Sequence, residues 1–210
     1  MKRRSDEEIS APLYAFDAEV RSQYGCFAGV DEAGRGPLCG PVCVAACILD
    51  PEKPVYGIND SKKLTEKKRE ALYDVIKETA VSYGIAFASE KEIDEMNILN
   101  ATFLAMKRAV EKLGVKPDLA LIDGNQKPHT GINEVTVIKG DGKSMSIAAA
   151  SVLAKVTRDR YMLELDKKYP QYEFKKHKGY GTKLHYEKLL EYGISDVHRK
   201  TFLKNLEDKR

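Results

Sequence analysis

Four acidic residues stand at or just beyond the ends of apolar runs that are typical of buried strands: Asp31, Glu32, Asp123 and Asp141. In α/β proteins the functional site lies beyond the C-terminal ends of the strands, so side chains distant in sequence can meet there. Clustered carboxylates repel one another unless cations neutralise them, and oxygen-rich sites suit Mg²⁺ or Mn²⁺. Two such ions about 3.5–4 Å apart can activate water and stabilise the leaving oxygen of a phosphodiester. The pattern predicts metal-dependent phosphodiester hydrolysis, although Asp-Gly pairs also end strands for structural reasons.

The adjacent pair Asp31 and Glu32 poses a geometric problem. Neighbouring residues of a regular strand point to opposite faces of the sheet. Either the strand ends between the two residues, or one of them assists the metal indirectly, through water or its main-chain carbonyl. No histidine lies beside any of the four acidic residues, which argues against a zinc or triad mechanism.

Two glycine-containing segments suggest nucleotide binding, but neither matches the full motif. Residues 140–144, Gly-Asp-Gly-Lys-Ser, lie between a predicted strand and a predicted helix like a phosphate-binding loop. A Walker motif needs glycine at position 137, which is Val137. Gly34-Arg35-Gly36 fails as a dinucleotide fingerprint because a strand follows it. The first alternative to a phosphodiesterase, a P-loop-like nucleotide hydrolase, therefore lacks its motif. The second alternative, a non-catalytic RNA-binding module, leaves the carboxylates unexplained.

Charge is unevenly distributed along the chain. Residues 167–210 contain twelve Lys/Arg and six Asp/Glu, whereas the remainder contains 23 Lys/Arg and 26 Asp/Glu. A basic C-terminal end suggests a polyanionic partner held there. The longest mostly apolar stretch, residues 41–49, is too short to span a bilayer, and the N-terminus lacks the apolar core of a signal peptide. We therefore expect a cytoplasmic protein that acts as a monomer and does not enter membranes.

The four cysteines are Cys26, Cys39, Cys43 and Cys47, and the last three recur every four residues. Cys43 and Cys47 fall in a predicted strand, about 13 Å apart at about 3.3 Å per residue, which is too far to share one ion. Cys39 precedes a Gly-Pro pair and so lies in a loop. We interpret these residues as buried free thiols.

The elements that must position the acidic residues follow from apolar periodicity. Strands are predicted over residues 26–31, 42–49, 83–89, 119–122 and 135–138. Helices are predicted from 65 to about 81, over 97–113 and from 144 to about 169, with one or two basic helices near the C-terminus. Residues 1–25 form a polar N-terminal extension without an assigned role. The order of these strands and helices along the chain predicts a single α/β domain over 1–210, with a mixed five-stranded sheet flanked by helices.

Several segments of the chain resemble those of a known family, ribonuclease HII. Residues 29–37, Gly-Val-Asp-Glu-Ala-Gly-Arg-Gly-Pro, are similar to the family's opening signature. Further blocks follow in the family's order, at residues 60–62, 121–124, 139–159, 177–182 and 198–199. A lysine in place of Arg35 and a substantial N-terminal domain would be expected of the sister type HIII, so type HII fits better. The resemblance spans about residues 29–202.

The resemblance implies a ribonuclease H-like fold with a helical, substrate-binding C-terminal extension at about 170–210. It assigns the catalytic and metal-binding roles to Asp31, Glu32, Asp123 and Asp141, with Mn²⁺ or Mg²⁺ as cofactor. It also implies cleavage of the RNA strand of RNA–DNA hybrids, and cleavage 5′ to single ribonucleotides in duplex DNA that leaves 3′-hydroxyl and 5′-phosphate ends.

The resemblance also implies that Gly34-Arg35-Gly36 recognises the 2′-hydroxyl of the ribonucleotide and that Tyr180 packs near its sugar. A 2′-hydroxyl distinguishes RNA from DNA, and glycines let the main chain approach it closely. Alternatively, the glycine loop is a plain tight turn and Tyr180 is a core aromatic. Lys62, Lys176 and Lys178 are candidates for phosphate contacts, although solvent-facing lysines are commoner.

Overall fold

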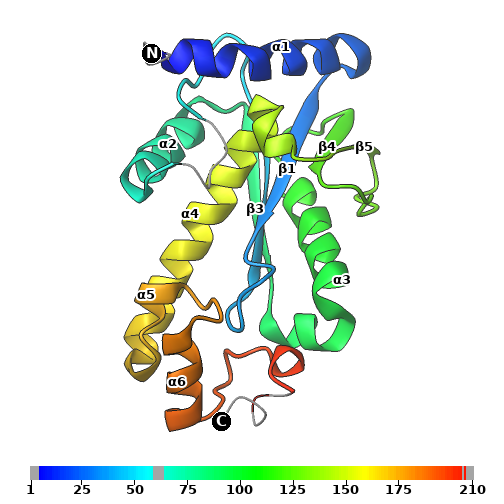
Figure 1. The fold of residues 1–210 in the computed structure, drawn as a ribbon. Helices are drawn as coiled ribbons and strands as arrows, with labels where there is room; N and C mark the ends of the chain where they lie inside the picture. Colours follow the sequence, from blue (N-terminus) through cyan, green and yellow to red (C-terminus); the bar gives the residue numbers. More distant parts are fainter. Residues whose placement is uncertain (1–4, 59–63, 205, 207–210) are drawn as a thin grey trace.

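A five-stranded mixed sheet forms the centre of the computed structural model, which describes residues 5–58, 64–204 and 206 (Figure 1). Its strands are β1 (Phe27–Ala33), β2 (Val42–Ile48), β3 (Ser82–Ala88), β4 (Leu119–Asp123) and β5 (Asn133–Val137). Their order across the sheet is β3-β2-β1-β4-β5. The β1–β2 and β2–β3 pairs are antiparallel, and β1–β4 and β4–β5 are parallel. The predicted mixed five-stranded α/β sheet is confirmed.

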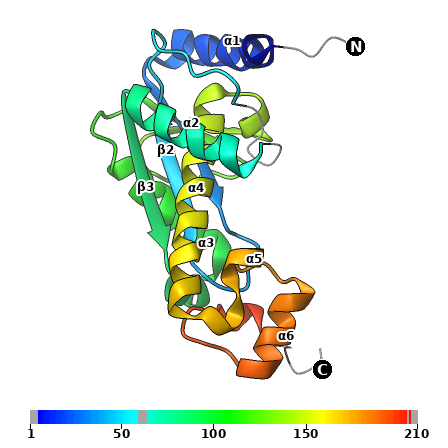
Figure 2. The same cartoon turned by 90° about the vertical axis from the view of Figure 1, so that its left-hand side faces the viewer.

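Helices cover both faces of this sheet. α2 (Glu66–Thr79) and α4 (Met145–Lys168) pack on one face, and α3 (Glu90–Glu111) packs on the other (Figures 1 and 2). β2 is buried on both sides: Cys43 and Cys47 face the α2/α4 core, whereas Val44 faces the α3 core. The strand is therefore continuously apolar rather than alternating, as expected of a strand covered on both faces.

α4 lies unusually close to β1. A Cβ at Gly29 would overlap the main chain of Ser146 and Ile147, so only glycine permits this approach. Small residues, Ala148 to Ala150, continue the contact along the helix and are fully buried. The close packing places the polar residues of α4 beside the C-terminal end of β1, where the acidic pair lies.

The C-terminal extension packs on the far end of α4 and on the loop after β1 (Figures 1 and 2). Its elements are the 3-10 turns η3 (Pro170–Tyr172) and η4 (Lys200–Phe202) and the helices α5 (Phe174–His177) and α6 (Lys183–Tyr192). Cys39 and His198 form an isolated antiparallel bridge that ties this extension to the loop after β1. The predicted C-terminal helical part is confirmed.

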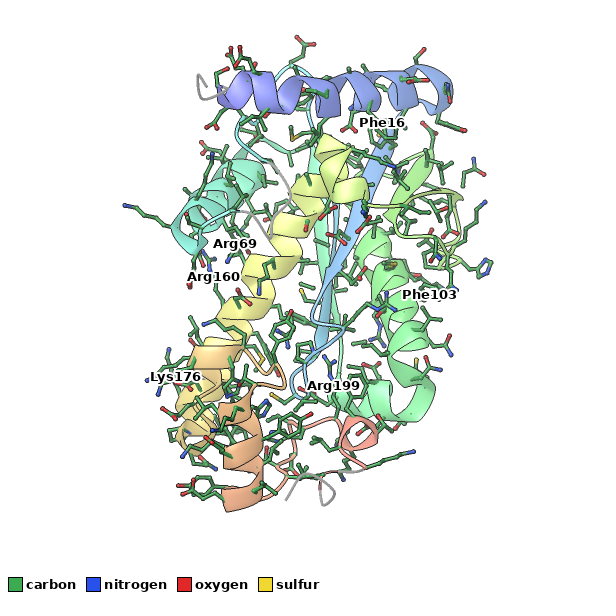
Figure 3. All side chains as sticks on the ribbon, in the orientation of Figure 1. Phe16, Arg69, Phe103, Arg160, Lys176 and Arg199 are labelled. Atoms are coloured by element: carbon green, nitrogen blue, oxygen red, sulfur yellow. The ribbon has the colours of Figure 1, made fainter. Side chains whose placement is uncertain are left out.

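The N-terminal segment differs from the prediction, because it forms the helix α1 (Asp6–Tyr24) across the opposite end of the molecule (Figure 1). Ser5 and Glu8 form a capping box at its start. Leu13 and Val20 are buried. Phe16 packs against the buried cluster that includes Phe27 and Leu119 at the start of β1 and β4 (Figure 3). The Ser-x-x-Glu capping signal is the sequence feature that indicates this helix start.

Several predicted boundaries were also wrong by one or more residues. β1 continues to Ala33, two residues beyond its predicted end. α3 begins at Glu90 rather than at residue 97, because Ser89 and Glu92 form a second capping box and the chain kinks at Asn97, where φ is 70°. β5 ends at Val137 rather than at residue 138. The core positions of these elements were nevertheless correct.

The cysteine interpretation is confirmed for three residues, since Cys39, Cys43 and Cys47 are free and buried, while Cys26 is partly exposed. No helix in the described part of the chain is long and apolar enough to cross a membrane.

Candidate active site

A hollow of about 200 Å³ at the C-terminal end of β1 contains most of the predicted site residues. Asp31, Glu32, Asp123, Gly34, Arg35 and Tyr180 all line it, together with Ala33, Ser151 and Lys155. A larger groove of about 840 Å³ lies between α1 and residues 49–56, and its lining is mostly apolar. We place the site in the smaller hollow because carboxylates from two strands converge there.

Asp31 is the most deeply buried carboxylate of this hollow, with 5% of its surface exposed. Its Oδ1 accepts a hydrogen bond of 2.7 Å from the main-chain N–H of Glu32. Burial raises the pKa of Asp31 well above its ordinary value, and the negative charges of Glu32 and Asp123 raise it further, while a hydrogen bond from Ser151 opposes the shift. A nearby cation would reverse this destabilisation of the charged form.

Glu32 resolves the geometric problem of the acidic pair. Strand pairing continues through both residues, with Asp31 opposite Ala45 and Glu32 opposite Val44, so the strand does not end between them. Glu32 still lines the same hollow as Asp31, and it also lines a neighbouring hollow on the α3 side that includes Asp123. Its Oε1 lies 3.6 Å from the guanidinium of Arg35.

Asp123 contacts the main chain of the turn that contains Asp141. The N–H of Gly140 donates a 2.6 Å hydrogen bond to Oδ1 of Asp123. Asp141 follows in the 3-10 turn η2 (Gly140–Gly142) and is buried, with 9% of its surface exposed. Because Gly140 uses its N–H on a carboxylate, this turn does not form the open cradle that a triphosphate-binding loop requires. The residue directly before Asp141 is therefore held by Asp123, whereas Asp141 itself is not among the residues that line the hollow.

The carboxylates fit hard divalent cations by the chemistry of their oxygen donors. Burial, together with their mutual repulsion, raises the pKa of Asp31. Within residues 5–58, 64–204 and 206, the tightest group of three metal-type ligands is Cys39, His185 and His198, whose donor atoms lie within 4.8 Å of one another. The acidic residues are spaced more widely than that group.

The predicted sugar-reading loop is shaped by two buried arginines. Gly34 has a φ of +95°, and a Cβ there would overlap the side chain of Arg158. Arg199, labelled in Figure 3, donates to the carbonyl oxygens of Gly34 and Arg35, at 2.6 and 2.8 Å. The glycine at position 34 is thus required by backbone conformation and by packing on Arg158.

Tyr180 lies in the turn between α5 and α6, and its ring borders Gly36. Its exposed fraction is 43%, so it is not a core aromatic. The charged ends of Lys155 and Arg158 each lie 6.0 Å from the ring centroid. An exposed ring flanked by cations is suited to meet a sugar beside a phosphate.

Four residues of this region received no role from the sequence, namely Ser151, Lys155, Arg158 and Arg199. The first three recur at i, i+4 and i+7 on α4, which places them on one helix face. That spacing is a signal that could have identified them. Arg199 has no such local signal, because its partners are far away in the chain.

The lysines predicted to contact phosphates have a mixed outcome. Lys62 lies outside the described residues. Lys176, labelled in Figure 3, forms an ion pair of 2.5 Å with Glu173, and Lys175 lies 3.9 Å from Asp166. Lys178 donates to the carbonyl oxygen of Lys175. Lys175 and Lys176 therefore already have acidic partners within the protein.

Comparisons with known proteins agree with this geometry. The family model described as Ribonuclease HII matches residues 28–205. A Ribonuclease HII of Caldicellulosiruptor bescii is 55% identical over 183 residues, which cover 87% of this chain and 89% of the relative. The crystal structure of ribonuclease H2 from Pyrococcus horikoshii has a TM-score of 0.72 at 28% identity and covers 88% of this chain and 98% of that one. The fold is shared more distantly with Bst-RNase HIII, solved in complex with Mn²⁺, with a TM-score of 0.64 at 19% identity over 80% of this chain and 63% of that one.

Proposed function

This chain belongs to the ribonuclease HII family and is a ribonuclease H that acts on RNA–DNA hybrids, and from that premise we propose that it also cuts duplex DNA 5′ to a single embedded ribonucleotide. Cleavage leaves 3′-hydroxyl and 5′-phosphate ends. One observation carries the proposal: Gly34 and Arg35 of the glycine loop, Tyr180 and three carboxylates line the same hollow. A sugar read there is held beside the groups that support hydrolysis.

The cofactor is a divalent metal ion, and we propose that two Mn²⁺ or Mg²⁺ ions are held by Asp31, Glu32, Asp123 and Asp141. When bound, these ions supply the charge that activates the attacking water and stabilises the leaving oxygen. The protein orients the ligands: Ser151 hydrogen-bonds Asp31, and the N–H of Gly140 holds Asp123. The Mn²⁺ complex of the distant relative with this fold supports the choice of ion.

Recognition of the ribonucleotide is proposed to use the N–H groups of the loop. The carbonyl oxygens of Gly34 and Arg35 already accept hydrogen bonds from Arg199. We therefore expect the loop N–H groups to donate to the 2′-hydroxyl, the group that distinguishes RNA from DNA. Tyr180 would stack on the adjacent deoxyribose and so sense the junction between RNA and DNA, while Lys155 would lie near the phosphate.

The test uses the purified protein, which we propose acts as a cytoplasmic monomer with a single domain. It is incubated with a DNA duplex containing one ribonucleotide, with Mg²⁺ or with a chelator, and the ends of the products are identified. The proposal predicts one cut 5′ to the ribonucleotide that disappears with the chelator. Asp123→Asn should bind the duplex but not cut it, since the isosteric amide removes charge and little packing. A wild type that cuts long hybrids but ignores the single ribonucleotide would contradict the proposal.

A further inference from the structure

Three of the four histidines gather inside the C-terminal extension, away from the carboxylates. His177, His185 and His198 are buried there, with exposed fractions of 7%, 0% and 1%. The rings of His177 and His185 stack, with centroids 4.3 Å apart. The buried thiol of Cys39 lies within 4.8 Å of the ligand nitrogens of His185 and His198. The proposed mechanism makes no use of these side chains.

Main-chain partners determine which ring nitrogen of each histidine carries the proton. Nδ1 of His185 lies 3.0 Å from the carbonyl oxygen of Tyr180, which can only accept, so Nδ1 carries the proton and Nε2 is an acceptor. Nε2 of His198 lies 3.1 Å from that acceptor and must therefore donate. The other nitrogen of His198, Nδ1, accepts from the main-chain N–H of Ser195, as this assignment requires. The chain of protons thus runs from His198 through His185 to Tyr180.

His177 is ordered in the same way and holds the segment that follows it. Its Nε2 lies 3.0 Å from the carbonyl oxygen of Tyr172 and so donates, while its Nδ1 accepts from the N–H of Gly179. The N–H of Tyr180 donates to the carbonyl oxygen of His177. Gly179 and Tyr180 are therefore held by side-chain and main-chain bonds to these histidines.

This order of protons requires three neutral rings. A second proton on His185 would face the N–H of His198, and a second proton on His198 would face the N–H of Ser195. Burial lowers the pKa of all three, to about 4 for His185 and about 3 for His198. Asp166 and Glu173 are the charged groups near His177, and Arg158, Arg199 and Glu90 are those near Cys39. Cys39 stays a neutral thiol, because burial raises its pKa to about 12.

Gly179 and Tyr180, the segment that the histidines hold, contact the sugar-reading loop directly. The carbonyl oxygen of Gly179 accepts a 2.8 Å bond from the N–H of Leu38, two residues after Gly36. The N–H of Arg199 donates to the carbonyl oxygen of Leu38, and its side chain holds Gly34 and Arg35. The histidines consequently sit behind both segments that would contact the ribonucleotide.

We propose that His177, His185 and His198 are positioning residues, whose fixed tautomers hold Tyr180 against the Gly34-Arg35-Gly36 loop. The inference rests on the proposed function, in which Tyr180 senses the RNA–DNA junction. A metal ion on Cys39, His185 and His198 is the competing interpretation. It would move the proton of His198 to Nδ1, opposite the N–H donor of Ser195, so the hydrogen bonds favour the metal-free chain.

The tautomers can be measured directly by nitrogen-15 NMR of the imidazole rings in the purified full chain. Near neutral pH we expect the proton on Nδ1 of His185 and on Nε2 of His177 and His198. His129, the exposed fourth histidine, gives a reference signal in the same spectrum. Any other tautomer set, or stoichiometric zinc in elemental analysis of the protein, would overturn the inference whatever the substrate preference proves to be.

The functional part is tested with two substitutions of His185. Asn places an amide N–H near the position of Nδ1 and keeps the donor for Tyr180, whereas Gln reaches toward Nε2 and loses it. Relative to wild type, His185→Gln should lower kcat/KM on the single ribonucleotide by about tenfold and on a continuous hybrid by less than about threefold, the loss expected for one positioning hydrogen bond. His185→Asn should restore most of this loss, and His129→Gln should leave both rates unchanged.

The outcomes separate this inference from the proposed function. If wild type cuts the single ribonucleotide but His185→Gln loses both substrates equally, or neither, the histidines do not position Tyr180. If wild type itself does not cut the single ribonucleotide, the proposed function fails, and the positioning role that rests on it fails with it. The NMR measurement would then still report whether the ordered chain exists.

Discussion

Arg199 donates hydrogen bonds to the carbonyl oxygens of Gly34 and Arg35, which precede it in the chain by 165 and 164 positions. It also donates to the carbonyl oxygen of Gly40, so one fully buried guanidinium holds three points of the loop after β1. Burial lowers the pKa of Arg199 to about 10, as does the nearby charge of Arg158. This cation is satisfied by main-chain carbonyls in place of a carboxylate.

Arg199→Lys should lower the free energy of unfolding by about 2–4 kcal/mol, since a lysine cannot reach all three carbonyls and hydrogen bonds to charged groups contribute about 1.5–3 kcal/mol each. Urea unfolding measures this change. Arg160→Lys is the matched control, because Arg160 lies on the surface and pairs with Glu70 (Figure 3). The control should cost less than about 1 kcal/mol. Equal effects of the two substitutions would show that Arg199 does not brace the loop.

Asp17 gives the N-terminal helix a role near the acidic residues. Its carboxylate accepts from the hydroxyl of Ser144 and from both the N–H and the hydroxyl of Ser146, at 2.6–2.8 Å. Asp17→Ala should lower the free energy of unfolding by about 1–3 kcal/mol, because buried donors lose their acceptor. It should also weaken Mn²⁺ binding in a titration, since Ser144 follows the turn that contains Asp141. Glu19→Ala, on the exposed side of α1, should change neither quantity.

The pKa of Asp31 predicts a dependence on pH that metal should reverse. Because the pKa of this acid is higher in the folded than in the unfolded chain, the folded state is favoured at low pH and loses that stabilisation as pH rises through the folded pKa. In a chelator, the melting temperature of wild type should therefore fall relative to that of Asp31→Asn as pH rises. Added Mg²⁺ should remove the difference for wild type. If the difference in melting temperature between wild type and Asp31→Asn does not change with pH, the pKa of Asp31 is not raised in the folded chain.

The carboxylates could be found from sequence because their signal is local: each stands where an apolar run stops. Tyr180 and the glycine loop were found through the resemblance, which carries family information that spacing alone lacks. The resemblance included residues 177–182 and 198–199 as family blocks, but the roles of Arg199 and the histidines could not be predicted, because they act on main-chain groups that only the fold brings near. The helix α1 was missed for another reason, namely that its polar composition outweighed its capping box. For Gly34 the structure adds a requirement that the sequence did not reveal, since packing on Arg158 already requires glycine there.

Salt dependence tests the basic C-terminal segment. Each lysine that contacts a phosphate contributes about 0.9 to the log–log slope of duplex affinity against salt, so three independent contacts would contribute about 2.7. Changing Lys175, Lys176 and Lys178 together to Gln should flatten the slope by less, by under about 2. The reason is that Lys175 and Lys176 already face Asp166 and Glu173. Lys116→Gln, before the N-terminal end of β4, is the control and should leave the slope unchanged. A flattening of the full three contacts would mean that these ion pairs open on binding.

The central claim, that one hollow both reads the ribonucleotide and cuts beside it, is tested most directly by single-turnover cleavage with Tyr180→Ala. The ring borders Gly36 and lines the hollow that contains Asp31 and Asp123, so its loss should remove recognition without removing the ligands. The predicted result is a loss of about tenfold or more on a single embedded ribonucleotide, a stacking contribution of about 1–3 kcal/mol, with a much smaller loss on a continuous hybrid. Tyr180→Phe, which keeps the ring, should behave like wild type. Equal losses of Tyr180→Ala on both substrates would contradict the account.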